Sequence, residues 1–262
     1  MSDFYLTLPS NSSMDIYSDN TMTNFKTMLP NRIELGKQWE VGLVEIQYPH
    51  TWYNLREGEE IIIQAADRPP WLAEDSTLGR VVIRIPPGYY PTVVHLAQRI
   101  EKEISKAMNL VNEKPVSFQY DKIKRKIKAR VEIRKSPSSY ITLGSTIQRI
   151  FGFDSNIIHG GVTEGSLVVD MDPLHSIYVY CDLIEPRVVG DKMVQLLRVV
   201  PVEGDHGDVV TRIYKNVHYI PIQLKSFEGV MIDIRGDLGE NIPFERGILN
   251  VTLHLRPRQL IL

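Results

Sequence analysis

The chain contains one cysteine, Cys181, whose thiol is the first side chain to test for nucleophilic chemistry. A catalytic thiol needs a neighbouring histidine and an electropositive, partly open environment. Cys181 instead alternates with Val179 and Leu183 in a period-two pattern, which places all three on the apolar side of a strand. We therefore interpret Cys181 as a small core residue, and we expect no intrachain disulfide and no cysteine metal site.

The acidic stretch 203–208 is the second candidate, because Glu203, Asp205, His206 and Asp208 bring four possible metal ligands together. A calcium loop needs oxygen ligands at alternate positions and a closing glutamate at the twelfth, and this stretch has neither. We interpret it as a solvated loop. Walker, dinucleotide, GxSxG and HExxH motifs are also absent from the sequence. The sequence thus nominates no catalytic residue, no metal site and no cofactor, and predicts a protein that is not an enzyme.

Residues 121–135 hold eight basic and two acidic side chains. Stacking aromatics among the cations would favour nucleic-acid binding, but Phe118 and Tyr120 precede the run. Apolar residues alternate with the cations, as in a hairpin arm with one solvated face: Ile127, Ala129, Val131 and Ile133. The pattern favours a solvated face over an acidic partner surface or packaged DNA, so nucleic acid is not expected as a specific partner.

Arg235, Gly236 and Asp237 spell the tripeptide that integrins recognise. Gly236 and Gly239 follow a strand-like run, and Gly and Asp are common in turns because they tolerate unusual backbone angles. The preferred interpretation is a tight turn, with the tripeptide kept as a receptor-binding candidate.

The composition is that of a globular protein, with 43% hydrophobic and 24% charged residues among 262. Thirty Lys and Arg against 32 Asp and Glu give a formal charge of −2, which excludes a global attraction to nucleic acid or anionic lipid. No apolar run approaches the roughly 20 residues of a membrane span, and the first residues lack the order of a signal peptide. We expect a protein that is made in the cytoplasm or nucleus and is not secreted.

Residues 1–38 differ from the rest of the chain, because polar side chains dominate their middle and apolar ones lie near the ends. We interpret this segment as an extended N-terminal arm that orders by placing its apolar side chains on a body or on a neighbouring subunit. The candidate subunit-interface residues are Phe4, Tyr5, Leu6, Leu8 and Phe25.

From Trp39 onward a period-two pattern dominates, which predicts a mostly β fold in one domain over 39–262. In 39–48 both alternating sets are apolar, which predicts a strand covered on two faces. About ten strand-like runs occur at the spacing of a sandwich. The clearest half-buried strands are predicted at 80–85, 177–184, 230–235 and 249–256.

Two helices are predicted to interrupt the strands. Apolar residues recur at helical spacing from Val93 to Val111, with Pro91 suited to the first turn, and this helix is expected to cover one sheet. A second, short helix is indicated by Ser145 with Gln148, which has the form of a capping box, and by Gly152 at its end.

Eight sequence blocks between residues 4 and 257, taken in order, resemble the minor capsid (penton) proteins of Maverick or Polinton elements and their adintovirus relatives. The blocks are SNSS, NTMTNFKTMLPNRIEL, WEVGLVEIQYPHTWYN, PPGYYPTVVHLAQRI, ITLGSTIQRIFGF, IYVYCDLIEPRVVGDKMVQLLRVVPV, HYIPI and GENIPFERGILNVTLHLRP.

The resemblance implies an all-β fold, a single jelly-roll sandwich with one covering helix and a short second helix. It implies five copies in a ring, a homopentamer that closes the vertices of an icosahedral capsid built from a double jelly-roll major capsid protein. It further implies a place in the virion capsid, without cofactor or catalytic residues. The more distant adenovirus penton base carries its integrin tripeptide on a long insertion, which Arg235 to Asp237 lack here.

Two other classes of protein stay open beside a capsid vertex protein. A jelly-roll binding module for glycan or protein would need an exposed aromatic platform, and the candidates are His50, Trp52, Tyr53, Tyr89 and Tyr90. An enzyme would need a pocket in which titratable groups converge.

Overall fold

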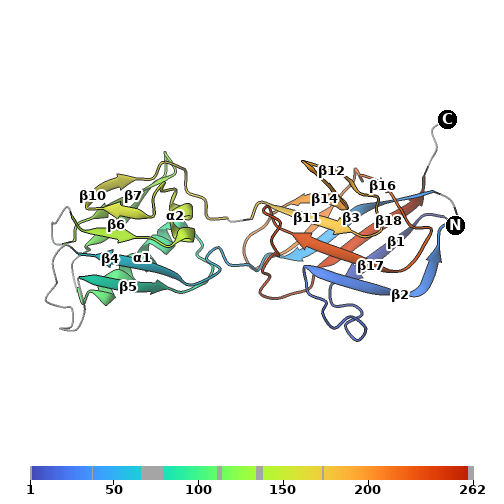
Figure 1. Cartoon of the computed structure of the whole chain (residues 1–262), viewed down its shortest axis with the longest axis horizontal. Helices are drawn as coiled ribbons and strands as arrows, with labels where there is room; N and C mark the ends of the chain where they lie inside the picture. Colours follow the sequence, from blue (N-terminus) through green and yellow to red (C-terminus); the bar gives the residue numbers. More distant parts are fainter. Residues whose placement is uncertain are drawn as a thin grey trace. The chain divides into compact units, whose positions relative to one another are not determined.

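The computed structural model describes residues 2–36, 38–65, 79–110, 114–133, 138–172 and 174–258. The chain divides into two compact units (Figure 1), which we call the sandwich unit (Met1–Trp52 with Leu174–Leu262) and the inserted unit (Tyr53–Pro173). Each unit has its own cluster of buried apolar side chains. The range 39–262, expected from the sequence to be one domain, thus contains two clusters of buried side chains.

The sandwich unit is built from two antiparallel sheets. One sheet has the order β1-β18-β3-β15, with β16 paired to β3, and the other has the order β14-β11-β17-β2. A separate hairpin, β12 with β13, precedes β14. The strands are β1 (Phe4–Pro9), β2 (Asn24–Glu34), β3 (Trp39–Pro49), β11 (Ser176–Cys181), β12 (Arg187–Val189), β13 (Lys192–Val194), β14 (Leu196–Pro201), β15 (Val209–Ile213), β16 (Ile220–Pro221), β17 (Ser226–Arg235) and β18 (Asn250–Pro257).

The strand order identifies this sandwich as a jelly roll. When its eight principal strands are counted along the chain, without β16 and the β12–β13 hairpin, the two sheets read 1-8-3-6 and 5-4-7-2. This is the arrangement of two Greek keys wrapped into a double-sheet jelly roll. The predicted fold class, an all-β single jelly roll, is confirmed, and the inserted unit interrupts it between β3 and β11.

Residues 1–38 are part of this sandwich and not an arm outside it. β1 pairs with β18 along its whole length, and β2 pairs with β17. Leu8 and Phe25 are buried in the core of the same chain. The polar middle of the segment is the loop between β1 and β2, and the strands themselves need an apolar side chain only at every second position.

Strand β3 explains why both of its alternating sets are apolar. Its pairing with β18 shifts register between Leu43 and Glu45, so that Val44 is an extra residue in the ladder. Such a bulge changes the phase of the alternation. Leu43 before it and Ile46 after it therefore reach the same core, whereas Glu45 is only partly buried. The predicted burial on two faces is wrong, because one covered face and a bulge produce the same sequence pattern.

The inserted unit combines two small antiparallel sheets with the two helices. The sheets have the orders β5-β4-β8-β9 and β10-β7-β6, and helix α1 packs against β5 and β6. The helices thus cover the inserted unit's sheets and not those of the jelly roll. The elements are β4 (Glu59–Gln64), β5 (Arg80–Ile85), α1 (Val93–Ala107), β6 (Val116–Asp121), β7 (Lys126–Val131), β8 (Tyr140–Thr142), α2 (Ser145–Phe151), β9 (Ile157–His159) and β10 (Gly161–Glu164).

The helix ends differ in detail from the sequence prediction. Thr92 caps α1, since its side chain accepts a hydrogen bond from the amide of His95, and Pro91 therefore precedes the cap. Helix α2 begins after Gly144 with no side-chain cap. The side-chain amide of Gln148 instead donates to the carbonyl of Phe153. The predicted capping box is therefore wrong. Gly152 ends α2 at φ 73°, as predicted.

Candidate functional site

Cys181 lies on the core face of β11 and is 1% exposed. Burial raises the pKa of its thiol to about 12, because the thiolate would lose its hydration. The prediction of a core cysteine is confirmed.

We expect Cys181 to be unreactive in the folded protein. A thiol reagent such as 5,5′-dithiobis(2-nitrobenzoate) at pH 8 should label almost none of the native chain and one thiol per chain in guanidinium, because the thiolate is the reactive species. Fast, complete labelling without denaturant would contradict the burial of this side chain.

The acidic stretch 203–208 is held by hydrogen bonding between Asp205 and Asp208 and by contacts with Arg212 and Trp52. The Glu203 carboxylate accepts two bonds from Arg212 at 2.8 and 3.1 Å, and Asp208 accepts from the amide of Asp205 at 2.9 Å. The His206 ring lies 3.1 Å from the carbonyl of Trp52. No group of three or more possible metal ligands is found in the described part of the chain.

Arg235 is the last residue of β17, and Gly236 and Asp237 lead into the predicted turn. The two charged side chains bond within the sandwich unit. Arg235 donates to Asp233 at 2.9 Å. Asp237 accepts from the backbone amides of His175 and Ser176 at 2.7 and 3.3 Å. The Arg235 guanidinium and the Asp237 carboxylate are therefore both engaged in hydrogen bonds within the chain. Integrin recognition requires these two charged groups to be accessible to the receptor.

The aromatic platform that a glycan-binding module would use is largely internal. His50 and Trp52 are 3% and 1% exposed, and their rings stack at a centroid distance of 4.1 Å. Tyr90 is half-buried and donates from its hydroxyl to the carbonyl of Pro86. Tyr53 and Tyr89 are also only partly exposed.

The basic run forms the predicted hairpin, β6 with β7, and its apolar side is buried. Lys124 pairs with Glu164 at 3.0 Å. The Asp121 carboxylate accepts from the amides of Ile123 and Lys124, and these bonds lower its pKa. The cations of the described part therefore line a solvated face, as predicted, whereas residues 134 and 135 lie outside the described residues.

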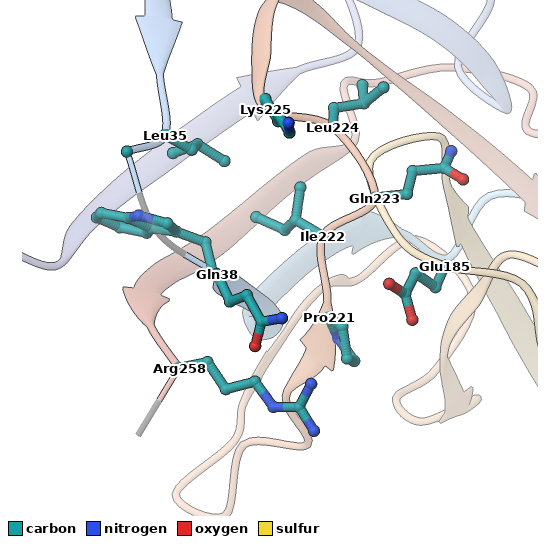
Figure 2. Close-up of a pocket in the computed structure, with 11 residues that line it drawn as sticks. Leu35, Gln38, Glu185, Pro221, Ile222, Gln223, Leu224, Lys225 and Arg258 are labelled. Atoms are coloured by element: carbon teal, nitrogen blue, oxygen red, sulfur yellow. The ribbon is translucent and has the colours of Figure 1, made fainter. Parts of the chain in front are cut away.

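One end of the sandwich holds a hollow of about 380 Å³, where the β2–β3 turn and the end of β18 meet the segment 221–225. Figure 2 shows Ile222 near its centre, between Arg258 with Gln38 on one side and Glu185 with Gln223 on the other. The lining contains one carboxylate, Glu185, and no histidine. Glu185, Lys225 and Arg258 are the charged side chains of its described lining.

A second hollow, of about 580 Å³, lies on the outer face of the sheet that contains β11 and β17, beside the β12–β13 hairpin. Met193 and Met231 give it an apolar part, and Asp233 forms an ion pair with Arg235. Asp182 also lines it and accepts from the amide of Met231 at 2.9 Å. Burial is the main cause that raises the pKa of Asp182, and that hydrogen bond opposes it.

We expect the Asp182→Asn variant to be more stable than the wild type at pH 7. A raised folded-state pKa means that ionised Asp182 opposes folding above its pKa, and protonation on acidification removes that cost. An asparagine keeps the acceptor for Met231 without the charge. Urea unfolding should show a stability gain that shrinks as the pH falls through the folded-state pKa towards the ordinary value of 3.8. A gain that grows on acidification would contradict this assignment.

The five interface candidates from the N-terminal segment occupy different environments. Leu8 and Phe25 are 1% and 0% exposed in the core, so their side chains are not accessible to a neighbour. Phe4 and Leu6 pack partly against the same core. Tyr5 is 64% exposed and stacks on the ring of His254.

Exposed apolar side chains also occur at the edge of the sandwich opposite β1, where the sequence predicted no interface residue. Val209 and Ile213 on β15 are 64% and 65% exposed, and Val199 on β14 is 40% exposed. Both strands end their sheets. The sequence places Val209, Thr211 and Ile213 on one side of this strand and Val210 and Arg212 on the other, and this pattern does not reveal which side faces solvent.

Fold and pockets together define a jelly-roll protein with a large insertion and, in its described residues, two open hollows. The chain is similar in structure to the penton protein of mavirus, with a TM-score of 0.50 and 12% identity over 97% of this chain and 99% of that one. This likeness shows a shared fold across both units.

The D2–D3 domains of the flagellar cap protein FliD from Escherichia coli also align, over 97% of this chain and 100% of that one, with 10% identity. At a TM-score of 0.22 they carry no argument. No family model matches the chain, and a search of curated proteins finds no match. Among the described residues, no helix is both long and apolar enough to cross a membrane.

Proposed function

We propose that the protein is a structural capsid protein whose copies form the pentameric vertex, or penton, of an icosahedral particle. The observation that carries the proposal is a single jelly roll with an insertion between its third and fourth strands, in a fold shared with a mavirus penton protein across 97% of the chain. The sequence resemblance to Maverick, Polinton and adintovirus pentons agrees with it. The protein's partners are then itself, as a homopentamer, and a double jelly-roll major capsid protein, in a virion assembled in the host cytoplasm or nucleus.

The function is mechanical in this proposal, and rigidity is what it requires of the chain. The sandwich core is continuous between the sheets and contains Trp39, Tyr48 and Phe25, all at most 3% exposed. Close packing of this kind resists deformation. A ring of identical subunits also needs two different, complementary patches on each copy, since contacts around a fivefold axis are heterologous.

Native mass spectrometry of the purified full chain tests the proposal. The expected species has about five times the chain mass of 30.0 kDa. A protein that stays monomeric at a concentration of 100 µM, with or without the capsid proteins of the same particle, would contradict a vertex role.

A further inference from the structure

Two groups of exposed apolar side chains lie at opposite flanks of the sandwich unit, apart from others such as Tyr5, Leu238 and the β12–β13 pair. The β15 flank consists of Val209, Ile213 and Val199, on the end strands β15 and β14. The β2 flank consists of Met14 and Ile16, 43% and 59% exposed, in the loop 10–23 that precedes β2. Figure 1 shows β14 and β2 at opposite ends of their sheet, with this loop below β2. The two flanks therefore point away from each other on one molecule.

The β15 flank is an open edge. Edge strands of soluble proteins are usually protected by charges, prolines or a covering segment, because their unpaired backbone groups can pair with another chain. In the described part of the chain β15 pairs only with β3, and its exposed side carries Val209, Thr211 and Ile213. Arg198 of β14 lies over the Tyr214 ring at 3.6 Å, which joins the ends of both sheets into one surface.

The edge of β2, by contrast, is covered by the loop 10–23. Asn20 accepts from the amide of Lys26 at 2.9 Å and donates to its carbonyl at 2.9 Å. The amide of Met28 donates to the Ser13 hydroxyl at 2.9 Å. The loop is thus a fixed surface with Met14 and Ile16 exposed on it, and its hydrogen bonds occupy part of the edge of β2.

The charges of the two flanks are complementary. Loop 10–23 contains two aspartates, Asp15 and Asp19, both exposed, and no basic residue. On the β15 flank Arg212 is paired with Glu203, so the positive charge comes from Lys215, which is exposed, and from Arg198 over the Tyr214 ring. Opposite charges around apolar patches orient two surfaces as they meet.

From these features we infer that the β15 flank of one copy binds the β2 flank of the next copy. The partner is a second copy of this chain, and the contact is heterologous, so it propagates around a ring. This inference rests on the proposed function and specifies which surfaces form the vertex.

Two variants, each altered on one flank, test the inference by complementation. Val209→Asp with Ile213→Asp alters the β15 flank, and Met14→Glu with Ile16→Glu alters the β2 flank. The control is Val188→Asp with Met193→Asp, because these residues form an exposed apolar pair on the β12–β13 hairpin, 72% and 62% exposed. Circular dichroism and thermal unfolding show whether each variant keeps the wild-type fold.

Each flank variant alone should be monomeric by native mass spectrometry, with at least a 100-fold rise in the concentration needed for half-assembly. Burial of two charged side chains in place of apolar ones accounts for a loss of this size. Mixed together, the two variants should form a one-to-one heterodimer, because each keeps the flank that the other lacks. The altered flanks, both acidic, repel each other and stop further growth. The hairpin control should assemble as the wild type does.

The outcomes separate the inference from the proposed function. If the wild type forms a ring and either flank variant still forms that ring, the inference is wrong and the proposed function stands. If the two flank variants are monomeric and form no heterodimer when mixed, the β15 flank does not pair with the β2 flank. The heterodimer needs only the unaltered β2 flank of one variant and the unaltered β15 flank of the other. A wild type that never oligomerises contradicts the proposed function itself.

Discussion

Replacing Phe25 with alanine is expected to lower the free energy of unfolding of the sandwich unit by about 3–5 kcal/mol, which is typical of a buried phenylalanine. Phe25 is fully buried on β2, in the core that both sheets share. The smaller side chain leaves a cavity, because a sheet held by β17 cannot collapse into it. Urea unfolding followed by tryptophan fluorescence measures the loss, since Trp39 and Trp52 lie in the same core.

Tyr5→Ala is the matched control for that measurement. Tyr5 comes from the same N-terminal segment but is 64% exposed, so its loss should cost less than about 1 kcal/mol, chiefly the stacking on His254. If Tyr5→Ala proved more destabilising than Phe25→Ala, the placement of β1 and β2 in the sandwich would be wrong.

The second large effect is expected at Gly152, in the inserted unit. Its φ of 73° is left-handed, and a Cβ atom there would lie 2.5 Å from the carbonyl oxygen of Leu167. Gly152→Ala therefore combines backbone strain with a collision against a neighbouring backbone, and should destabilise the inserted unit by about 2–4 kcal/mol. Hydrogen exchange should show faster exchange of the α2, β7 and β10 amides, with the sandwich unit protected as before.

Gly190→Ala separates the two causes. Gly190 also has a left-handed φ, 61°, but no atom lies within 4 Å of its built Cβ. The alanine there should cost only the strain, about 1 kcal/mol. Equal effects at the two glycines would show that the contact between Gly152 and the Leu167 backbone does not form.

Half-buried strands are where the sequence was most informative. The predicted strand at 80–85 coincides with β5, and 249–256 differs from β18 by one residue at each end. In both strands one face is packed and the other solvated, so the alternation of side chains directly records burial. The left-handed end of α2 was similarly predictable, because glycine is the residue that adopts that backbone conformation at little cost.

The first of the two boundaries between the units left no trace in the sequence. It falls between Trp52 and Tyr53, inside an aromatic stretch, without the Gly, Pro or polar linker that usually marks a domain boundary, whereas the second follows Asp172 and Pro173. Both units are rich in strands, so periodicity did not change there. Only the pairing of β3 with β18, more than 200 residues away, reveals which segments share a core.

The candidate interface could be predicted only in part. Burial separates Tyr5 from Leu8 and Phe25, but alternation alone does not say which side of a strand faces the core when the segment is short. Predicting the β15 flank requires the strand order, because Val209 and Ile213 are interface candidates only if β15 is the last strand of its sheet. Strand order is a property of long-range pairing, which a single sequence does not display.

Electron cryomicroscopy of the assembled protein tests the central claim most directly. We predict a closed ring with fivefold symmetry, in which each sandwich unit contacts the next through the β15 and β2 flanks. A particle with a different rotational symmetry, or one in which both flanks face solvent in every subunit, would contradict this account.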